Sequence, residues 1–207
     1  MTEASTHALR PPQQVRSRLA WERALQAGLD LLETGGLDAV TITDVCRLGR
    51  ISPPSLYARV DGRAGLIAAI YEYGMTRIRA DEQQHMAAVD VDAPLEERLA
   101  AVIAAVAETF RRQRALLRPI VAASIQDEHI HRRGVEEAVR VQTEIARVLA
   151  LPGDAGTDIA TMVFAEGVFR TAYGDQYTAR GPETEEAFVA RLTRMALARA
   201  ASQDEEE

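Results

Sequence analysis

Three helix-start signals follow one another closely in residues 41–67, which read TITDVCRLGRISPPSLYARVDGRAGLI. Thr41 can cap a first short helix, where the carboxylate of Asp44 also faces the positive end of the helix. Ser52 can cap a second helix that opens with two prolines, at positions where a missing N–H costs nothing. Asp61 can cap a third, longer helix. Two short helices joined by a tight turn predict a helix-turn-helix, whose second helix can enter a DNA major groove.

This segment resembles the helix-turn-helix of the TetR family of repressors. The resemblance covers residues 25–70 and is most specific at Ser55-Leu56-Tyr57 followed by Arg63. It implies an all-α protein of about nine helices, with a three-helix DNA-binding head and a larger helical body that senses a ligand and dimerises. By the same resemblance, the positions that face bases are Thr43, Pro53, Pro54 and Ser55, and those that face phosphates are Tyr57, Arg59 and Arg63.

Three more residues complete the predicted DNA-binding surface: the two caps, Thr41 and Ser52, and the turn residue Arg50. The family often has glycine where Arg50 stands. Because a residue other than glycine at positive φ costs on the order of 1 kcal/mol, we expect Gly49 to take that conformation and Arg50 to be free for a phosphate. Taken singly, each residue of the surface could serve only helix formation or packing, but their joint spacing favours DNA binding.

The net charge of −7 by itself argues against binding to nucleic acid, but the charge is unevenly distributed. Residues 1–79 carry ten arginines and eight acidic residues, for a net charge of +2. Residues 80–207 carry fourteen arginines and 23 acidic residues, for a net charge of −9. The predicted helix-turn-helix therefore lies in the basic part, and DNA is expected to approach only that end.

No long uninterrupted apolar run occurs, so no membrane span is expected. The N-terminal residues lack the apolar stretch of a secretory signal, and the single cysteine, Cys46, cannot form an intrachain disulfide. We therefore expect a cytoplasmic protein. Cys46 is interpreted as a small packed residue of the second helix, with a redox switch as the alternative.

Breaks at proline and glycine divide the chain into four predicted parts. Residues 1–16 are a polar arm that either stays solvated or touches DNA, and residues 17–63 are the helix-turn-helix domain. Residues 64–201 are the ligand-binding and dimerisation domain, and residues 202–207 are an acidic tail. Apolar residues recur at helical spacing throughout. The expected helices span about 17–34, 41–49, 52–60, 62–85, 94–114, 116–126, 127–149, 157–179 and 183–201.

The resemblance further implies an apolar cavity in the body that binds a small-molecule effector. We expect a largely apolar effector, because nearly all candidate lining residues are apolar or aromatic; for each of them an ordinary place in the core is the alternative. Glu166 could supply a polar contact or form an exposed pair with Arg170. The candidates are Met86, Phe110, Leu117, Ile120, Val121, Met162, Glu166, Phe169 and Tyr173.

The last two helices are the predicted dimer interface. A symmetric pair of chains could bury their apolar residues in a four-helix bundle and would place two recognition helices about 34 Å apart on a palindromic operator. The residues expected at this interface are Phe164, Val168, Phe188, Leu192 and Met195.

Other classes of function fit the sequence less well. An α-helical enzyme would need a convergent catalytic set, but there is no nucleophile–histidine signature, Gly-rich phosphate loop or E-x-x-H pair. His129 and His131 diverge by about 200° on a helix, which disfavours a shared metal ion. We therefore expect no catalysis, metal or cofactor. A helical dimeric module that lacks DNA binding remains the second interpretation.

Overall fold

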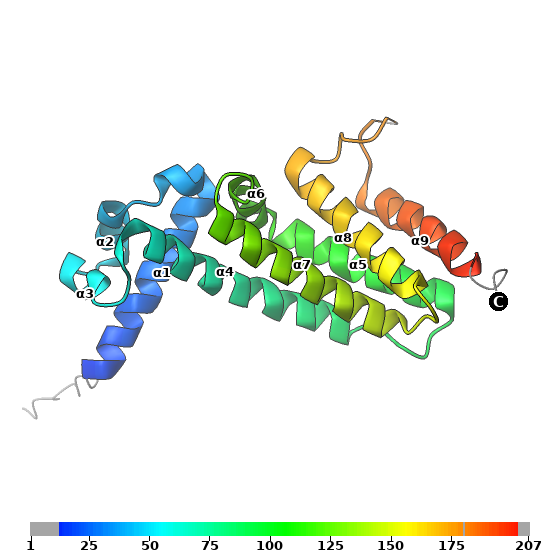
Figure 1. Ribbon diagram of the computed structural model, residues 1–207, viewed down its shortest axis with the longest axis horizontal. Helices are drawn as coiled ribbons and strands as arrows, with labels where there is room; N and C mark the ends of the chain where they lie inside the picture. The colour runs from blue at the N-terminus through cyan, green and yellow to red at the C-terminus, as the bar shows by residue number, and fades with distance from the viewer. Residues whose placement is uncertain (1–12, 180, 203–207) are drawn as a thin grey trace, which may run out of the picture. The chain divides into compact units, whose positions relative to one another are not determined.

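The computed structural model describes residues 13–179 and 181–202 of the 207-residue chain. Over these residues the chain forms nine α-helices and no strand, which confirms the predicted all-α class (Figure 1). The chain divides into two compact units, Met1–Tyr73 and Gly74–Glu207. The boundary falls inside α4 (Gly62–Ala87), later than the boundary expected between residues 63 and 64. Most of the predicted arm and tail, residues 1–12 and 203–207, lies outside the described residues.

The first unit contains α1 (Gln13–Ala39), α2 (Ile42–Gly49), α3 (Pro53–Tyr57) and the beginning of α4. α1 begins at Gln13, so residues 13–16 are helical instead of belonging to an arm. α1 kinks at Gly36, whose φ of 68° is available to glycine without a steric penalty. The core of this unit takes buried apolar side chains from all four helices: Leu25, Leu29, Val45, Leu56, Leu66 and Ile70.

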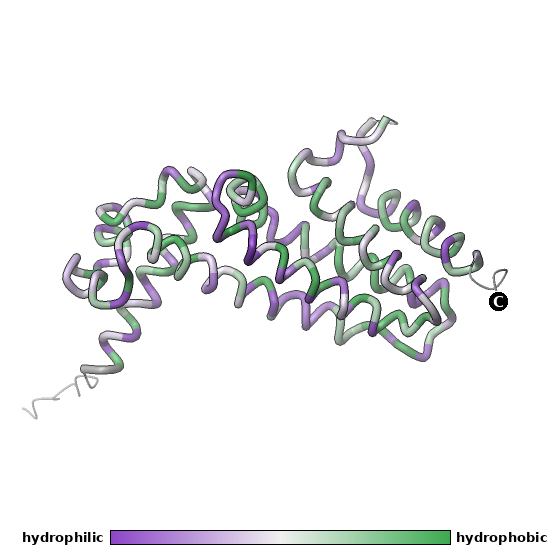
Figure 2. The backbone as a smooth tube through the Cα atoms, viewed as in Figure 1, coloured by the Kyte–Doolittle hydropathy of each residue, from purple (hydrophilic) through white to green (hydrophobic). Residues whose placement is uncertain are grey.

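The second unit contains the rest of α4 and five further helices. Its core gathers apolar residues of α5, α7, α8 and α9. The hydropathy colouring shows hydrophobic positions recurring along these helices between hydrophilic ones (Figure 2). The five helices are α5 (Leu95–Arg112), α6 (Arg114–Ala123), α7 (Glu128–Leu149), α8 (Ala155–Tyr173) and α9 (Glu185–Ala201).

α8 is the central helix of this unit. It packs against α5, α6, α7 and α9, which explains why its sequence is apolar nearly all round (Figure 1). α8 ends at Tyr173, earlier than expected, because Gly174 adopts a φ of 89° and leaves the helix. α9 then begins after Thr184, whose side chain accepts a hydrogen bond from the N–H of Ala187 at 3.2 Å.

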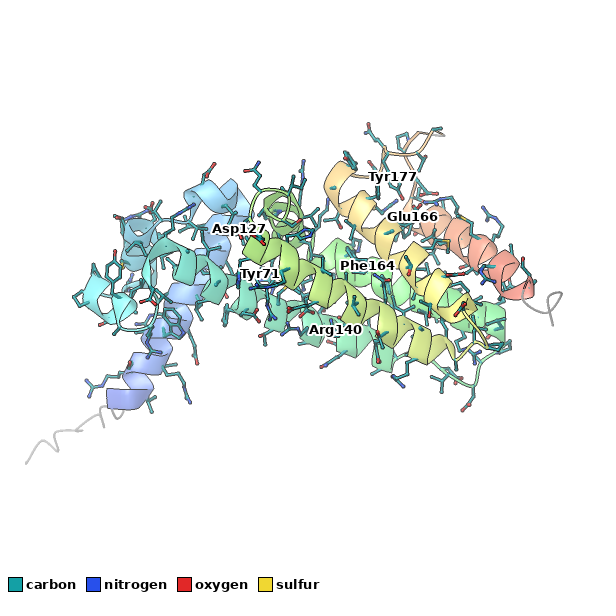
Figure 3. All side chains as sticks on the ribbon, in the orientation of Figure 1. Tyr71, Asp127, Arg140, Phe164, Glu166 and Tyr177 are labelled. Carbon is teal, nitrogen blue, oxygen red and sulfur yellow. The ribbon has the colours of Figure 1, made fainter. Side chains whose placement is uncertain are left out.

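Charged side chains connect α4 to α7 within the second unit. Arg140 of α7, labelled in Figure 3, forms a bidentate pair with Glu82 of α4 and also bonds Glu137. Glu82 is only 5% exposed. Arg79 of α4 binds Glu137 as well. Burial tends to raise the pKa of Glu137, but its bonds to Arg79 and Arg140 outweigh burial and lower it. The Glu137 carboxylate therefore stays ionised near neutral pH, and the ion pairs of Glu82 and Glu137 hold α4 against α7.

No helix among the described residues is long and apolar enough to cross a membrane.

Candidate functional site

The start of α2 is built by a local capping arrangement. Thr41 has extended backbone angles, and its Oγ1 accepts a hydrogen bond from the N–H of Asp44 at 3.1 Å and donates one to the Asp44 carboxylate at 2.7 Å. Arg47 also binds this carboxylate at 2.8 Å. The bonds from Arg47 and then Thr41 lower the pKa of Asp44, so its charge at the helix N-terminus persists. The predicted cap is confirmed. Thr43, the next candidate, is exposed.

The turn between α2 and α3 differs from the prediction. Arg50 itself takes the left-handed conformation (φ 52°, ψ 47°), and its N–H bonds the carbonyl of Cys46. Gly49 instead remains helical and is buried against α1. A side chain would not fit there, because a Cβ on residue 49 would lie 2.6 Å from the Cα of Ala24. The glycine is thus required for close contact between helices, which leaves Arg50 to close the turn. Its side chain is exposed and makes no hydrogen bond or ion pair with the residues that the structure describes.

This turn yields a prediction about stability. Arg50→Gly should stabilise the protein by about 0.5–1 kcal/mol, because glycine adopts the left-handed conformation without a Cβ clash. Ala150, which ends α7 at φ 47°, is a matched second site where the same gain is expected. Urea unfolding measures both. A loss of stability in Arg50→Gly with a gain in Ala150→Gly would mean that the Arg50 side chain supports the turn.

α3 presents a small polar face. Ser52 caps it, with its Oγ 3.4 Å from the N–H of Ser55 and 2.8 Å from the Ser55 hydroxyl. Leu56 points into the core and is fully buried. Tyr57 is 53% exposed, and its hydroxyl has no hydrogen-bond partner among the described residues. The exposed members of this face are Ser52, Pro53, Pro54, Ser55 and Tyr57.

The other two candidates for phosphate contact already bind atoms of the first unit. Arg59 donates to the Ser17 hydroxyl at 2.8 Å and lies over the ring of Trp21, 5.3 Å from its centroid. Arg63 donates from Nε to the carbonyl of Val40 at 2.9 Å and from Nη2 to that of Leu37. Both remain exposed at the surface. The sequence did not predict that these two arginines join α3 and α4 to α1. The carbonyl groups that Arg63 binds belong to the backbone, so no residue type in the sequence marks them.

The comparisons with known proteins concern the fold as a whole. No family model matches the sequence, and no curated protein matches it significantly. A TetR-like transcriptional regulator from Rhodococcus sp. RHA1 superposes with a TM-score of 0.65 at 17% identity, covering 93% of this chain and 99% of that one. A second Rhodococcus RHA1 regulatory protein of the TetR family gives a TM-score of 0.61 at 18% identity, over 87% and 96% of the two chains. The chain has the fold of the TetR-family transcriptional regulators.

A further structure with the TetR fold is similar to this chain. It is the TetR family repressor AlkX from a Dietzia strain, implicated in biodegradation of n-alkanes, with a TM-score of 0.51 at 16% identity over 87% of this chain and 97% of that one. In all three comparisons the match extends over both units, so the resemblance noted for residues 25–70 reaches the whole fold.

The candidate effector residues of this TetR fold do not gather around one cavity. Met86 lines a cavity of about 500 Å³ between α4 and α7, whereas Phe110 lines one of about 260 Å³ among α5, α6, α8 and α9. Phe169 and Tyr173 stack on each other, are 54% and 70% exposed, and line neither of these two cavities. The remaining apolar candidates are buried or half-buried in the second unit: Leu117, Ile120, Val121 and Met162.

Glu166 does not pair with Arg170. Its carboxylate accepts hydrogen bonds from the Tyr177 hydroxyl at 2.7 Å and from Arg191 at 3.0 Å (Figure 3). Burial, and then the bond to Glu166, raises the pKa of Tyr177 to about 12, so the phenol stays protonated at physiological pH. Glu166 thus ties the segment after α8 to α9 within the unit.

The predicted dimer interface also needs correction. Phe188 is 1% exposed and Leu192 is fully buried, because the apolar stripe of α9 packs on α5 inside the unit. Their side chains are therefore not available to a second chain. Phe164 and Val168 are half-buried, and Phe164 meets Phe110 edge to face at 5.7 Å. Met195, at 44% exposure, is the most accessible of the five candidates.

Cys46 is buried in α2, and burial raises the pKa of its thiol. The thiolate required for oxidation is therefore scarce at neutral pH, which supports the interpretation of Cys46 as a packed residue.

Proposed function

We propose that this protein is a DNA-binding transcriptional regulator, a repressor that binds a palindromic operator as a homodimer and is released by a small molecule. The observation that carries the proposal is the exposed face of α3, which lies next to Arg50 in its left-handed conformation, within a TetR fold. Tyr57 and Arg50 offer unengaged donors on this surface, which phosphate oxygens can accept. The prolines and Ser55 supply small groups that can approach base edges.

The roles of the arginines follow from their partners. Arg59 and Arg63 are held against α1, so we infer that they fix the orientation of α3 and α4 and contribute to phosphate binding only through their remaining N–H groups. Arg50 has no such partner and is the stronger candidate for a direct phosphate contact. The acidic second unit would repel DNA and restrict binding to the surface around α3.

DNA binding can be tested by mobility shift with duplex DNA from upstream of the protein's own gene, over a range of salt concentrations. Tyr57→Phe should weaken binding about tenfold, since it removes one hydrogen bond to a charged oxygen. Arg50→Gln should weaken binding and reduce the slope of log Kd against log salt by about one, as expected for the loss of one phosphate contact.

Arg194→Gln, an exposed change on α9, is the matched control and should leave the slope unaltered and weaken binding slightly at most. Absence of any shift at low salt would instead favour a helical dimeric module that does not bind DNA. Equal losses in Arg50→Gln and Arg194→Gln would remove the specific role assigned to the turn.

A further inference from the structure

The cavity among α5, α6, α8 and α9 contains polar groups whose hydrogen bonds are incomplete. The buried Nη1 of Arg170 has Glu183 Oε2 as an ion-pair partner at 3.7 Å but donates no hydrogen bond to a described residue, and Glu185 has a buried Oε1 that accepts none. The two side chains approach each other only at 3.5 Å, through other atoms. A buried donor or acceptor without a hydrogen bond is energetically unfavourable, so two such groups lining one cavity indicate a ligand that supplies both an acceptor and a donor.

Two further charged residues line the same cavity, and both are exposed at its surface. Arg114, at the start of α6, and Asp175, just after α8, make no side-chain hydrogen bond or ion pair with any residue the structure describes. Arg111, the remaining charged lining residue, is already paired in a bidentate way with Glu108 at 2.6 Å. Besides the paired Arg111, the lining thus holds two arginines and two carboxylates: Arg114 and Asp175, and the loosely paired Arg170 and Glu185.

This balance selects among ligand classes. A simple carboxylate would satisfy the arginines but would leave Glu185 Oε1 without a donor and add a third negative charge. A simple amine would do the reverse. A zwitterion adds no net charge, places its carboxylate on the guanidiniums and its ammonium on the carboxylates, and so meets all four groups.

The rest of the cavity lining is largely apolar, and the cavity is small. Phe110 and Phe188 contribute rings, and Gly167 leaves room beside Phe110, since a Cβ at that glycine would lie 3.0 Å from the ring. The volume of about 260 Å³ is below the range of drug-sized pockets, which is about 300–1,000 Å³. A small molecule with a short apolar side chain fits this wall.

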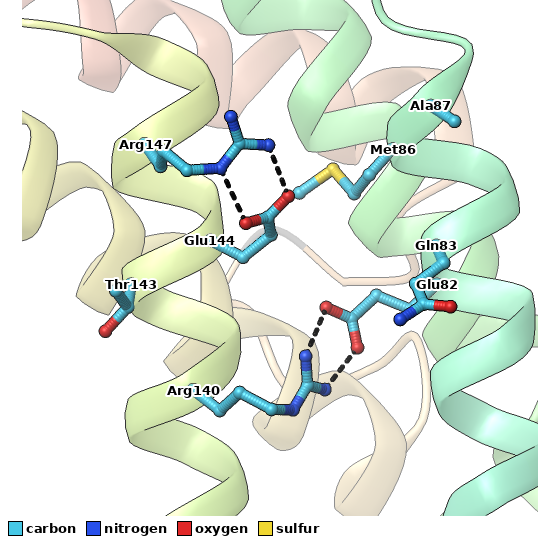
Figure 4. A pocket seen from close by; sticks show the side chains of 8 residues that line it. All are labelled: Glu82, Gln83, Met86, Ala87, Arg140, Thr143, Glu144 and Arg147. Carbon is cyan, nitrogen blue, oxygen red and sulfur yellow. Dashed lines mark hydrogen bonds and ion pairs between the residues drawn. The ribbon is translucent and has the colours of Figure 1, made fainter.

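The neighbouring cavity between α4 and α7 provides a contrast. There each of the two guanidiniums forms a bidentate pair with a carboxylate, Arg140 with Glu82 and Arg147 with Glu144 (Figure 4). A charged ligand would have to break these pairs to bind. The cavity among α5, α6, α8 and α9 requires no such exchange.

We propose that this cavity binds a small zwitterion of the apolar α-amino-acid type, with its carboxylate on Arg114 and Arg170 and its ammonium on Asp175 and Glu185. The role of this ligand as the effector rests on the function proposed above; its binding does not. The ligand class differs from the largely apolar effector expected from the sequence, because the cavity supplies charged groups that the sequence did not place together.

Isothermal titration calorimetry on the full chain tests the proposal with L-valine, L-leucine, L-isoleucine, L-methionine and L-phenylalanine. At least one should bind, and its analogues that lack either the amino or the carboxyl group should bind at least about tenfold more weakly. Arg114→Gln and Asp175→Asn should each weaken binding by a similar factor. Arg118→Gln, one turn further along α6 and exposed, should bind like the unaltered protein.

No binding of any of the five amino acids overturns the proposal, as does an acid or amine analogue that binds equally well. Unchanged affinity in both Arg114→Gln and Asp175→Asn also overturns it. A mobility shift with and without the bound amino acid then tests the effector role. Failure of the proposed function would appear separately, as absent DNA binding with amino-acid binding intact.

Discussion

Phe188→Ala is expected to lower the free energy of unfolding by about 3–5 kcal/mol, the usual cost of removing a buried aromatic ring. The ring is 1% exposed in the core of the second unit. The guanidiniums of Arg170 and Arg191 lie over it, 4.8 and 5.5 Å from its centroid, so its loss also removes two cation–π contacts. Urea unfolding followed by circular dichroism measures the change.

Phe169→Ala is the matched control, because Phe169 lies on the adjacent helix with its ring 54% exposed. Its loss should cost less than about 1 kcal/mol. The effect of Phe188→Ala should also be independent of protein concentration, since the ring packs within one chain. A cost that grows as the protein is diluted would instead place Phe188 between two chains and restore the interface expected from the sequence.

Gly49→Ala should be destabilising by about 2 kcal/mol, although alanine is the better helix former. The added Cβ would lie 2.6 Å from the Cα of Ala24, which is backbone and cannot rotate away. Either α1 or α2 must shift, and overpacking of this kind costs about 1–3 kcal/mol. A shift of α2 would also move Thr43 and the turn at Arg50, so DNA affinity should fall together with stability.

Gly134→Ala makes the same chemical change where nothing lies within 4 Å of the new Cβ. Gly134 is inside α7, so this substitution should stabilise the protein by up to about 1 kcal/mol through helix propensity alone. Opposite signs at the two glycines are the expected result, measured by urea unfolding of both variants. Stabilisation in Gly49→Ala would mean that α1 and α2 are not in close contact.

The helix-turn-helix could be predicted in detail at its helix starts. Thr41 and Ser52 cap α2 and α3 through atoms only three residues away, so the bonds are decided by local sequence. The burial of Leu56 and Val60 likewise follows from helical spacing. For the same reason the class of the fold and the order of its helices could be read from capping and periodicity.

The conformation of the turn could not be predicted in the same way. Whether Gly49 or Arg50 takes the positive φ depends on Ala24, which belongs to another helix. A glycine suits both a left-handed turn and a close helix contact, and the sequence does not say which of the two it serves. Similarly, Arg63 meets backbone carbonyls at the end of α1 that no side-chain pattern reveals.

For the described residues, the sequence by itself determined the nine helices, the caps of α2 and α3 and the apolar stripes, because these depend on residues within about one turn of one another. Only the tertiary structure decided which surface covers each stripe. It placed Phe188 and Leu192 against α5, and it set Arg114 and Asp175 around one cavity with Glu185. The local sequence around an apolar stripe or a charged residue is the same whichever surface or group it will contact. Its partner is therefore decided only when helices distant in the sequence pack together.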